Sequence, residues 1–125
     1  MIAANPDSAD ALNYLGYMLA ERGERLAEAI ALIGKALEME PENGAFVDSL
    51  GWAYFKKGEV DKALALLEKA VKLLGNDPAV REHLGDVYWK KGPKEKAVAQ
   101  WEAALALDPK NKALQEKLRN AKWQK

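Results

Sequence analysis

Apolar side chains recur along this chain at the three- to four-residue spacing of amphipathic helices. The clearest stripes lie in residues 26–39 and 60–73, where leucine, isoleucine and valine face one side of a helix. Short polar or glycine-containing stretches separate these segments, so the pattern predicts an all-α fold of about seven helices. The predicted helices cover residues 8–22, 26–39, 44–57, 60–73, 78–91, 94–107 and 112–123.

The same residue types return with a fixed period. Leu-Gly pairs stand at 15–16, 50–51 and 84–85, at spacings of 35 and 34 residues. A second glycine follows each pair, and small residues recur in the helix after it; these are Gly23, Gly58 and Gly92, then Ala29, Ala63 and Ala97, then Ala36, Ala70 and Ala104. Such self-similarity indicates a stack of like units, each too small to bury its apolar face alone.

Each recurring position has a physical reason. The glycines of the Leu-Gly pairs fit where two helices press together, and the second glycines fit the left-handed conformation that often ends a helix. Pro41 and Pro109 cannot continue a preceding helix, while Asn43 and Asn111 are good N-caps for the next one. The first unit has one additional residue, which we expect in the turn near Glu24, where an insertion costs least.

This order of Leu-Gly, Tyr, Gly, Ala, Ala and Pro positions resembles the tetratricopeptide repeat and recurs three times over about residues 9–109. The resemblance implies a right-handed α-solenoid of antiparallel helix pairs. The expected division is 9–43, 44–77 and 78–111 for the repeats, 112–125 for a capping helix and 1–8 for the remnant of a preceding repeat. One departure is the first-helix aromatic, usually Trp, which is replaced by Leu12, Val47 and Arg81; Trp101 compensates in a second helix.

The two ends are expected to differ. Residues 112–125 offer Leu118-Arg119 and Lys122 where a further repeat would need its Leu-Gly pair and its tyrosine, as a capping helix should. Asn5-Pro6-Asp7 looks like the end of a preceding repeat, so we expect a fragment of a longer array; a naturally short or engineered module is the alternative. A missing upstream repeat would leave an apolar N-terminal face exposed, which predicts contact between copies of the chain.

Charge and composition narrow the function further. The 19 basic and 19 acidic side chains cancel, but residues 1–43 hold eight acids and three bases, whereas residues 78–125 hold six acids and eleven bases. This asymmetry either steers partners or is a chance excess of solvated charge. No apolar run approaches the roughly 18 residues of a membrane span. Several stretches resemble long bacterial repeat proteins, and the sequence is compatible with the bacterial cytoplasm and with the periplasm.

Catalysis finds no support in the sequence. His83 is the only histidine, and its neighbours in sequence offer no nucleophile or partner for a general base, which favours a structural role. Cysteine is absent, and no phosphate-binding loop or paired metal ligands occur, so we expect neither an enzyme nor a cofactor or metal. The lysines of the last third are scattered among acids, which favours a solvated surface over nucleic-acid binding.

The resemblance implies that the first helix of each pair lines a concave groove that contacts a protein or peptide partner. The groove residues implied in this way are Asn13, Tyr17, Asp48, Trp52, Phe55, Lys56, Glu82, Asp86, Trp89 and Lys90, with Trp123 added by the capping helix. Large aromatic side chains on such a surface are typical binding anchors. Two interpretations of these aromatics stay open, since they either bind the partner or pack between neighbouring first helices.

One branch of the family grips a C-terminal carboxylate with Lys, Asn and Arg side chains. The corresponding places here hold Asn13, Tyr17, Trp52, Ala79 and His83, so only the asparagine is retained and the resemblance implies no carboxylate clamp. We therefore expect a scaffold that binds a helical or extended segment, with helix-in-groove recognition as the simplest mode. The alternatives are a structural or self-assembling module that acts through the N-terminal face, or an accessory domain of a larger protein.

Overall fold

The computed structural model describes residues 8–123, and in this part of the chain seven α-helices and no strand occur. The helices are α1 (Ala9–Arg22), α2 (Leu26–Met39), α3 (Gly44–Lys57), α4 (Val60–Leu73), α5 (Pro78–Lys91), α6 (Lys94–Leu107) and α7 (Lys112–Trp123). The predicted all-α fold is confirmed, and only α1 differs from its predicted span, since it begins one residue later. The expected remnant of an upstream repeat lies, apart from Ser8, outside the described residues.

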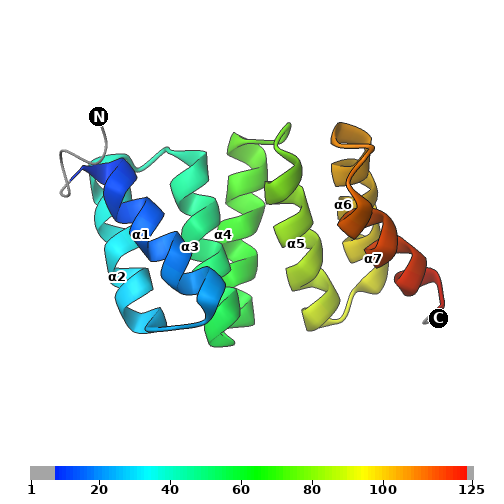
Figure 1. The fold of residues 1–125 in the computed structure, drawn as a ribbon, viewed down its shortest axis with the longest axis horizontal. Coiled ribbons are helices and arrows are strands. Elements are labelled where there is room, and N and C mark those ends of the chain that lie inside the picture. Colours follow the sequence, from blue (N-terminus) through cyan, green and yellow to red (C-terminus); the bar gives the residue numbers. More distant parts are fainter. Residues whose placement is uncertain (1–7, 124–125) are drawn as a thin grey trace.

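The helices form consecutive pairs, α1 with α2, α3 with α4 and α5 with α6, and α7 packs on α6. The pairs follow one another along the longest axis of the molecule, with α1 and α2 at one end of the array and α7 at the other (Figure 1). Contacts between pairs join α2 to α3 and α4 to α5, and the first helices α1, α3 and α5 also touch in sequence order. The fold is therefore an α-solenoid, in which each unit is stabilised by its neighbours.

The glycines of the Leu-Gly pairs lie at the closest approach within each pair, as predicted. A Cβ atom added to Gly16 would lie 2.6 Å from Ile33 Cγ1, and one added to Gly51 would lie 2.8 Å from Leu67 Cγ. At Gly85 it would lie 2.4 Å from Cδ1 of the Trp101 ring. Any larger residue would push the paired helices apart.

The turns also follow the prediction. Gly23 and Gly58 end their helices with φ angles of 69° and 93°, in the left-handed region that favours glycine. Asn43 accepts hydrogen bonds from two backbone N–H groups at the start of α3. The additional residue of the first unit lies in the turn between α1 and α2, where Arg25 also takes a left-handed conformation with φ 50°.

The core runs between the helix pairs as a row of apolar clusters. Ile33, Leu67 and Leu114 are completely buried, one in each of three successive clusters. Arg81, which stands at a usual tryptophan position, is held by polar contacts instead: its Nε donates to the Gly75 carbonyl at 2.7 Å and its Nη1 donates to Gln100 Oε1 at 3.1 Å. These contacts connect α5 to α6 and to the preceding turn.

At the N-terminal end, the large apolar side chains of Tyr14 and Leu15 are 65% and 49% exposed. They lie on α1, where the sequence predicts an apolar face. Over residues 8–123, every helix is too short or too polar to meet the requirements of a membrane span.

Candidate partner-binding groove

The first helices present one common face. On α3, Asp48 and Phe55 are seven residues apart, and on α5 the same interval separates Ala79 from Asp86. Seven residues make about two helical turns, so each pair lies on one side of its helix, roughly 10 Å apart along the axis. Two pockets open on this side. We call the face that carries them the first-helix groove.

The first is the acidic pocket, a cavity of about 810 Å³. It is lined by Asp10, Ala11, Asn13, Tyr14, Tyr17, Ala45, Asp48, Ser49, Ala79 and His83, from α1, α3 and α5. The second is the tryptophan pocket, a cavity of about 420 Å³. It is lined by Phe55, Asp86, Trp89, Lys90, Trp101, Lys117, Asn120 and Ala121, from α3, α5, α6 and α7.

The acidic pocket is built around the carboxylate of Asp48. The imidazole Nδ1–H of His83 donates to Asp48 Oδ1 at 2.9 Å, and only about a tenth of either side chain is exposed. The side-chain Oδ1 of Asn13 is buried without a hydrogen-bond partner among residues 8–123. Much of the lining is alanine and tyrosine, and no lysine or arginine of the described residues lines the pocket, so its fully charged side chains are the carboxylates of Asp10 and Asp48.

The neighbouring carboxylates raise the pKa values of two lining residues, Tyr17 and His83. Burial raises the pKa of the Tyr17 phenol to about 12, and the carboxylates of Glu21, Asp48 and Glu82 add to the increase. Burial by itself would lower the pKa of His83. The hydrogen bond to Asp48 and the surrounding carboxylate charges outweigh that effect, so the pKa of His83 is raised above its ordinary value.

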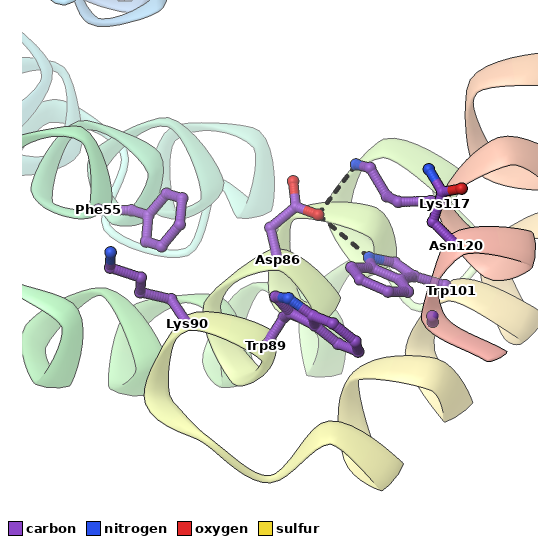
Figure 2. Close-up of a pocket in the computed structure, with 8 residues that line it drawn as sticks. Phe55, Asp86, Trp89, Lys90, Trp101, Lys117 and Asn120 are labelled. Carbon is purple, nitrogen blue, oxygen red and sulfur yellow. Dashed lines mark hydrogen bonds and ion pairs between the residues drawn. The ribbon is translucent and has the colours of Figure 1, made fainter. Parts of the chain in front are cut away.

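The tryptophan pocket has its own cation (Figure 2). Asp86 Oδ1 accepts from Trp101 Nε1 at 3.1 Å and from Lys117 Nζ at 2.9 Å. The Trp89 ring lies beside Trp101, with 5.3 Å between ring centroids, and the Lys94 ammonium lies 3.8 Å from the centroid of Trp89. The pocket thus combines two indole rings with a compensated carboxylate.

Lys117 also donates to Glu82 Oε2 at 2.5 Å, so one ammonium from α7 is shared by two carboxylates of α5. Burial would lower the pKa of Lys117, but the two carboxylates raise it above its usual value. The pKa of Asp86 is also raised, because burial and the charge of Glu82 outweigh the effect of Lys117. One cation therefore stabilises a pair of acids that repel each other.

Trp52 lies between the two pockets and lines neither of them. Its side chain is 8% exposed, its Nε1 donates to Glu21 Oε1 at 2.6 Å, and its ring stacks on His83 with 4.1 Å between centroids. Phe55 also stacks on the indole, with 5.2 Å between ring centroids. Trp52 therefore packs between first helices, as one of the two interpretations of the aromatics requires.

The ten implied groove residues are thus distributed along the whole face. Asn13, Tyr17 and Asp48 line the acidic pocket, and Phe55, Asp86, Trp89 and Lys90 line the tryptophan pocket. Trp52, Lys56 and Glu82 lie between or beside the pockets, and the Lys56 ammonium lies 5.3 Å from the Trp52 ring. The side chain of Trp123 lies outside the described residues.

The partner of His83 was not predicted from the sequence. The neighbours of His83 in sequence offer none, whereas Asp48 stands 35 residues earlier on the adjacent first helix. The same intervals recur between first helices: 35 residues separate Glu82 from Lys117, and 31 residues separate Glu21 from Trp52. A search for complementary side chains at 31 and 35 residues could have found these pairs.

The pockets show no sign of a metal centre within residues 8–123, because no three acidic or histidine side chains there are placed to hold an ion together. Four of the five positions compared with a carboxylate clamp line the acidic pocket, namely Asn13, Tyr17, Ala79 and His83. The fifth position, Trp52, is buried beside it. This arrangement suits contact with another molecule through aromatic, acidic and amide groups.

A family model described as tetratricopeptide repeat matches residues 22–84 and again 54–121. The chain belongs to the tetratricopeptide repeat family. Over 60 residues, or 48% of the chain, it is 47% identical to the TPR repeat-containing protein PA4667 of Pseudomonas aeruginosa. That match spans 10% of the length of the relative.

Several solved structures share the fold of this chain. The first TPR of Spaghetti (RPAP3), solved with the HSP90 peptide SRMEEVD, superposes with a TM-score of 0.84 at 23% identity, over 95% of this chain and 94% of the other. TTC0263, a thermophilic TPR protein of Thermus thermophilus, gives a TM-score of 0.80 at 26% identity, over 96% and 66%. Tetratricopeptide folds of this kind generally mediate protein–protein interaction and are typically non-enzymatic scaffolds.

Proposed function

We propose that this chain is a protein–protein interaction scaffold whose first-helix groove binds a helical or extended segment of a partner protein. The observation that carries the proposal is the pair of pockets on one face of α3 and α5. On α3, the lining residues Asp48 and Phe55 of the two pockets lie roughly 10 Å apart along the helix axis, a length that matches about three residues of extended chain or two turns of helix. A single short segment would therefore fill both.

The apolar contribution to binding comes mainly from the tryptophan pocket. Phe55 and Trp89 are partly exposed there, next to the buried ring of Trp101. Aromatic anchors in a partly enclosed pocket carry a large share of the binding energy in many interfaces. An apolar side chain of the partner segment would displace water from these rings.

The similar fold of the RPAP3 domain supports peptide binding as a mode of action, because that domain was solved with a peptide bound. The peptide SRMEEVD contains three acidic residues, whereas the pocket described above is itself acidic. We propose that the groove of this chain has no carboxylate clamp and binds segments of another kind. The groove would distinguish partner segments by their charge as well as by their shape.

Phe55→Ala tests the proposal. A partner recovered with the wild-type chain should bind this variant about tenfold more weakly or worse, because an aromatic anchor is lost. Isothermal titration calorimetry measures the affinity, and circular dichroism checks that helical content is unchanged. Leu107→Ala is the matched control, since Leu107 is an exposed apolar residue at the end of α6. Equal affinities of both variants and the wild type would refute the groove assignment.

A structural module that pairs through its N-terminal face is the second candidate, and the exposed side chains of Tyr14 and Leu15 favour it. Its occupant would be a second copy of the chain. Light scattering over a range of concentrations separates the two candidates. A monomer at every concentration would count against self-association and leave the groove proposal unaffected.

A further inference from the structure

Each of α3, α5 and α7 carries one side chain that stands 31 and 35 residues after two side chains of the preceding first helix. We call each such place a junction, and the charge of the later side chain changes from one junction to the next. At the last junction, Lys117 lies between Glu82 and Asp86. One repeat earlier, His83 bonds to Asp48 and stacks on Trp52. The spacings are alike, at 31 and 35 residues, so the three side chains of each group occupy corresponding places.

At the first junction the corresponding residues are Asn13, Tyr17 and Asp48, all of which line the acidic pocket. The side chain in the place of the lysine is here an aspartate. Asp48 lies close enough to Tyr17 to contribute to the raised pKa of the phenol. Cationic character therefore falls from Lys117 to His83 and is replaced by negative charge at the first junction.

The contacts of Lys117 show which groups surround a cation at the last junction. Its ammonium binds two carboxylates and lies 5.6 Å from the centroid of the Trp101 ring. The acidic pocket offers similar groups, namely the carboxylates of Asp10 and Asp48 and the rings of Tyr14 and Tyr17, and no lysine or arginine of the described residues lines it. Its one basic lining residue is His83, which bonds to Asp48. Carboxylates beside aromatic faces are favourable surroundings for an ammonium or guanidinium group.

Two further polar groups of the acidic pocket also favour a cationic ligand. Asn13 Oδ1 is a buried acceptor without a donor among the described residues, and Asp10 is an exposed carboxylate at the start of α1. Lysine and arginine carry donors only, whereas a carboxylate ligand would bring more acceptors and more negative charge. Shape alone would admit either ligand, but charge favours the cation.

We propose that the acidic pocket receives a lysine or arginine side chain of the partner segment, which would lie beside the carboxylates of Asp10 and Asp48 much as Lys117 lies beside Glu82 and Asp86 at the other end of the array. This inference rests on the proposed groove function and specifies one residue type in the partner. The segment would then carry a cation and, roughly 10 Å further along, an apolar residue for the tryptophan pocket.

A set of labelled peptides tests this inference. The first is a ten-residue alanine-based peptide with one arginine and with leucines three and seven residues after it, so that both extended and helical forms place a leucine roughly 10 Å away. Two matched peptides carry glutamine or glutamate in place of arginine. Fluorescence anisotropy at pH 7.5, at low and moderate salt, measures their affinities.

The arginine peptide should bind about tenfold more tightly than the glutamate peptide, and the difference should shrink with salt. Asp10→Asn and Asp48→Asn should each weaken the arginine peptide several-fold and leave the glutamine peptide unaffected. Glu102→Gln is the control, because it removes the same charge from an exposed position on α6. Asp10→Asn remains informative if Asp48→Asn fails to fold.

The outcomes separate this inference from the groove proposal. Equal binding of all three peptides, lost in Phe55→Ala, would overturn the cation site and support the groove. Binding insensitive to Phe55→Ala and to both aspartate variants would overturn both. If no peptide binds at millimolar concentration, the cation inference is refuted, and the affinity of the recovered partner for Phe55→Ala still decides the groove.

Discussion

The two pockets of the groove share α3 and α5 in their walls, yet within the described part of the chain the acids of one pocket are paired with a lysine and those of the other are not. In the tryptophan pocket, Asp86 is bound by the Trp101 indole and by Lys117, which also binds Glu82. In the acidic pocket, Asp48 has His83 as its hydrogen-bond partner and no lysine or arginine of the described residues lines the cavity. The acids of the tryptophan pocket are therefore neutralised by a lysine of the chain itself, whereas the acids of the acidic pocket have no lysine or arginine of residues 8–123 beside them.

The difference follows from the capping helix. α7 packs through Leu114 and Leu118 against α6, and this places the ammonium of Lys117 over α5. The side chains at corresponding places on α3 and α5 are Asp48 and His83, which cannot supply a permanent positive charge. A groove built from repeats with the same backbone therefore has regions of different charge. Under the proposed function, this difference would set the direction in which a segment binds.

The largest expected effect comes from removing that internal cation with Lys117→Met. Two neighbouring carboxylates would lose their shared partner while the apolar stem is kept. Because Lys117 is about a third exposed, we expect the unfolding free energy to fall by about 1–2 kcal/mol. Urea unfolding followed by circular dichroism measures it.

Lys112→Met is the control for this variant, because Lys112 is exposed at the start of the same helix. It should change stability by no more than about 0.5 kcal/mol. Equal stability of the two variants would mean that the charge of Lys117 does not hold α7 on α5.

A smaller effect is expected from pH at the other pocket. The pKa of His83 is raised in the folded chain by Asp48 and the nearby carboxylates. Protonated His83 therefore stabilises the fold fully below its unfolded pKa of about 6.5, and this contribution is lost as pH rises through the folded value. The unfolding free energy of His83→Gln should not fall in this way as the pH rises.

Urea unfolding of the wild type and His83→Gln, measured from about pH 5.5 to pH 8.5, checks this expectation. His83 is the only histidine, so the two stability profiles should converge on the alkaline side and separate on the acidic side. Parallel profiles would show that the pair with Asp48 has no linkage to folding.

Much of the fold could be predicted because its causes are local and periodic. Gly16, Gly51 and Gly85 occur in a fixed register, and each marks a helix crossing that admits no Cβ. The helix ends follow from glycine and asparagine positions in the same way. The turn near Arg25 accommodates the one insertion without changing the helices on either side.

The site was less predictable because its contacts cross between repeats. Trp52 and His83 both stand out in the sequence, but their stacking depends on how α5 lies against α3. The binding of Lys117 to two acids of α5 likewise depends on the return of α7 over the groove. The implied residues do lie along one face, but which of them pack and which are available to a partner depends on these packing angles.

The central claim is that a partner segment binds along α1, α3 and α5. The most direct measurement is a map of amide chemical-shift changes in the isotopically labelled chain as a recovered partner segment is added. We expect the largest changes at residues of the two pockets, such as Tyr17, His83 and Trp89, and none along the outer faces of α2, α4 and α6. Changes confined to those second helices, or to Leu15 and the surface of α1 outside the acidic pocket, would contradict it.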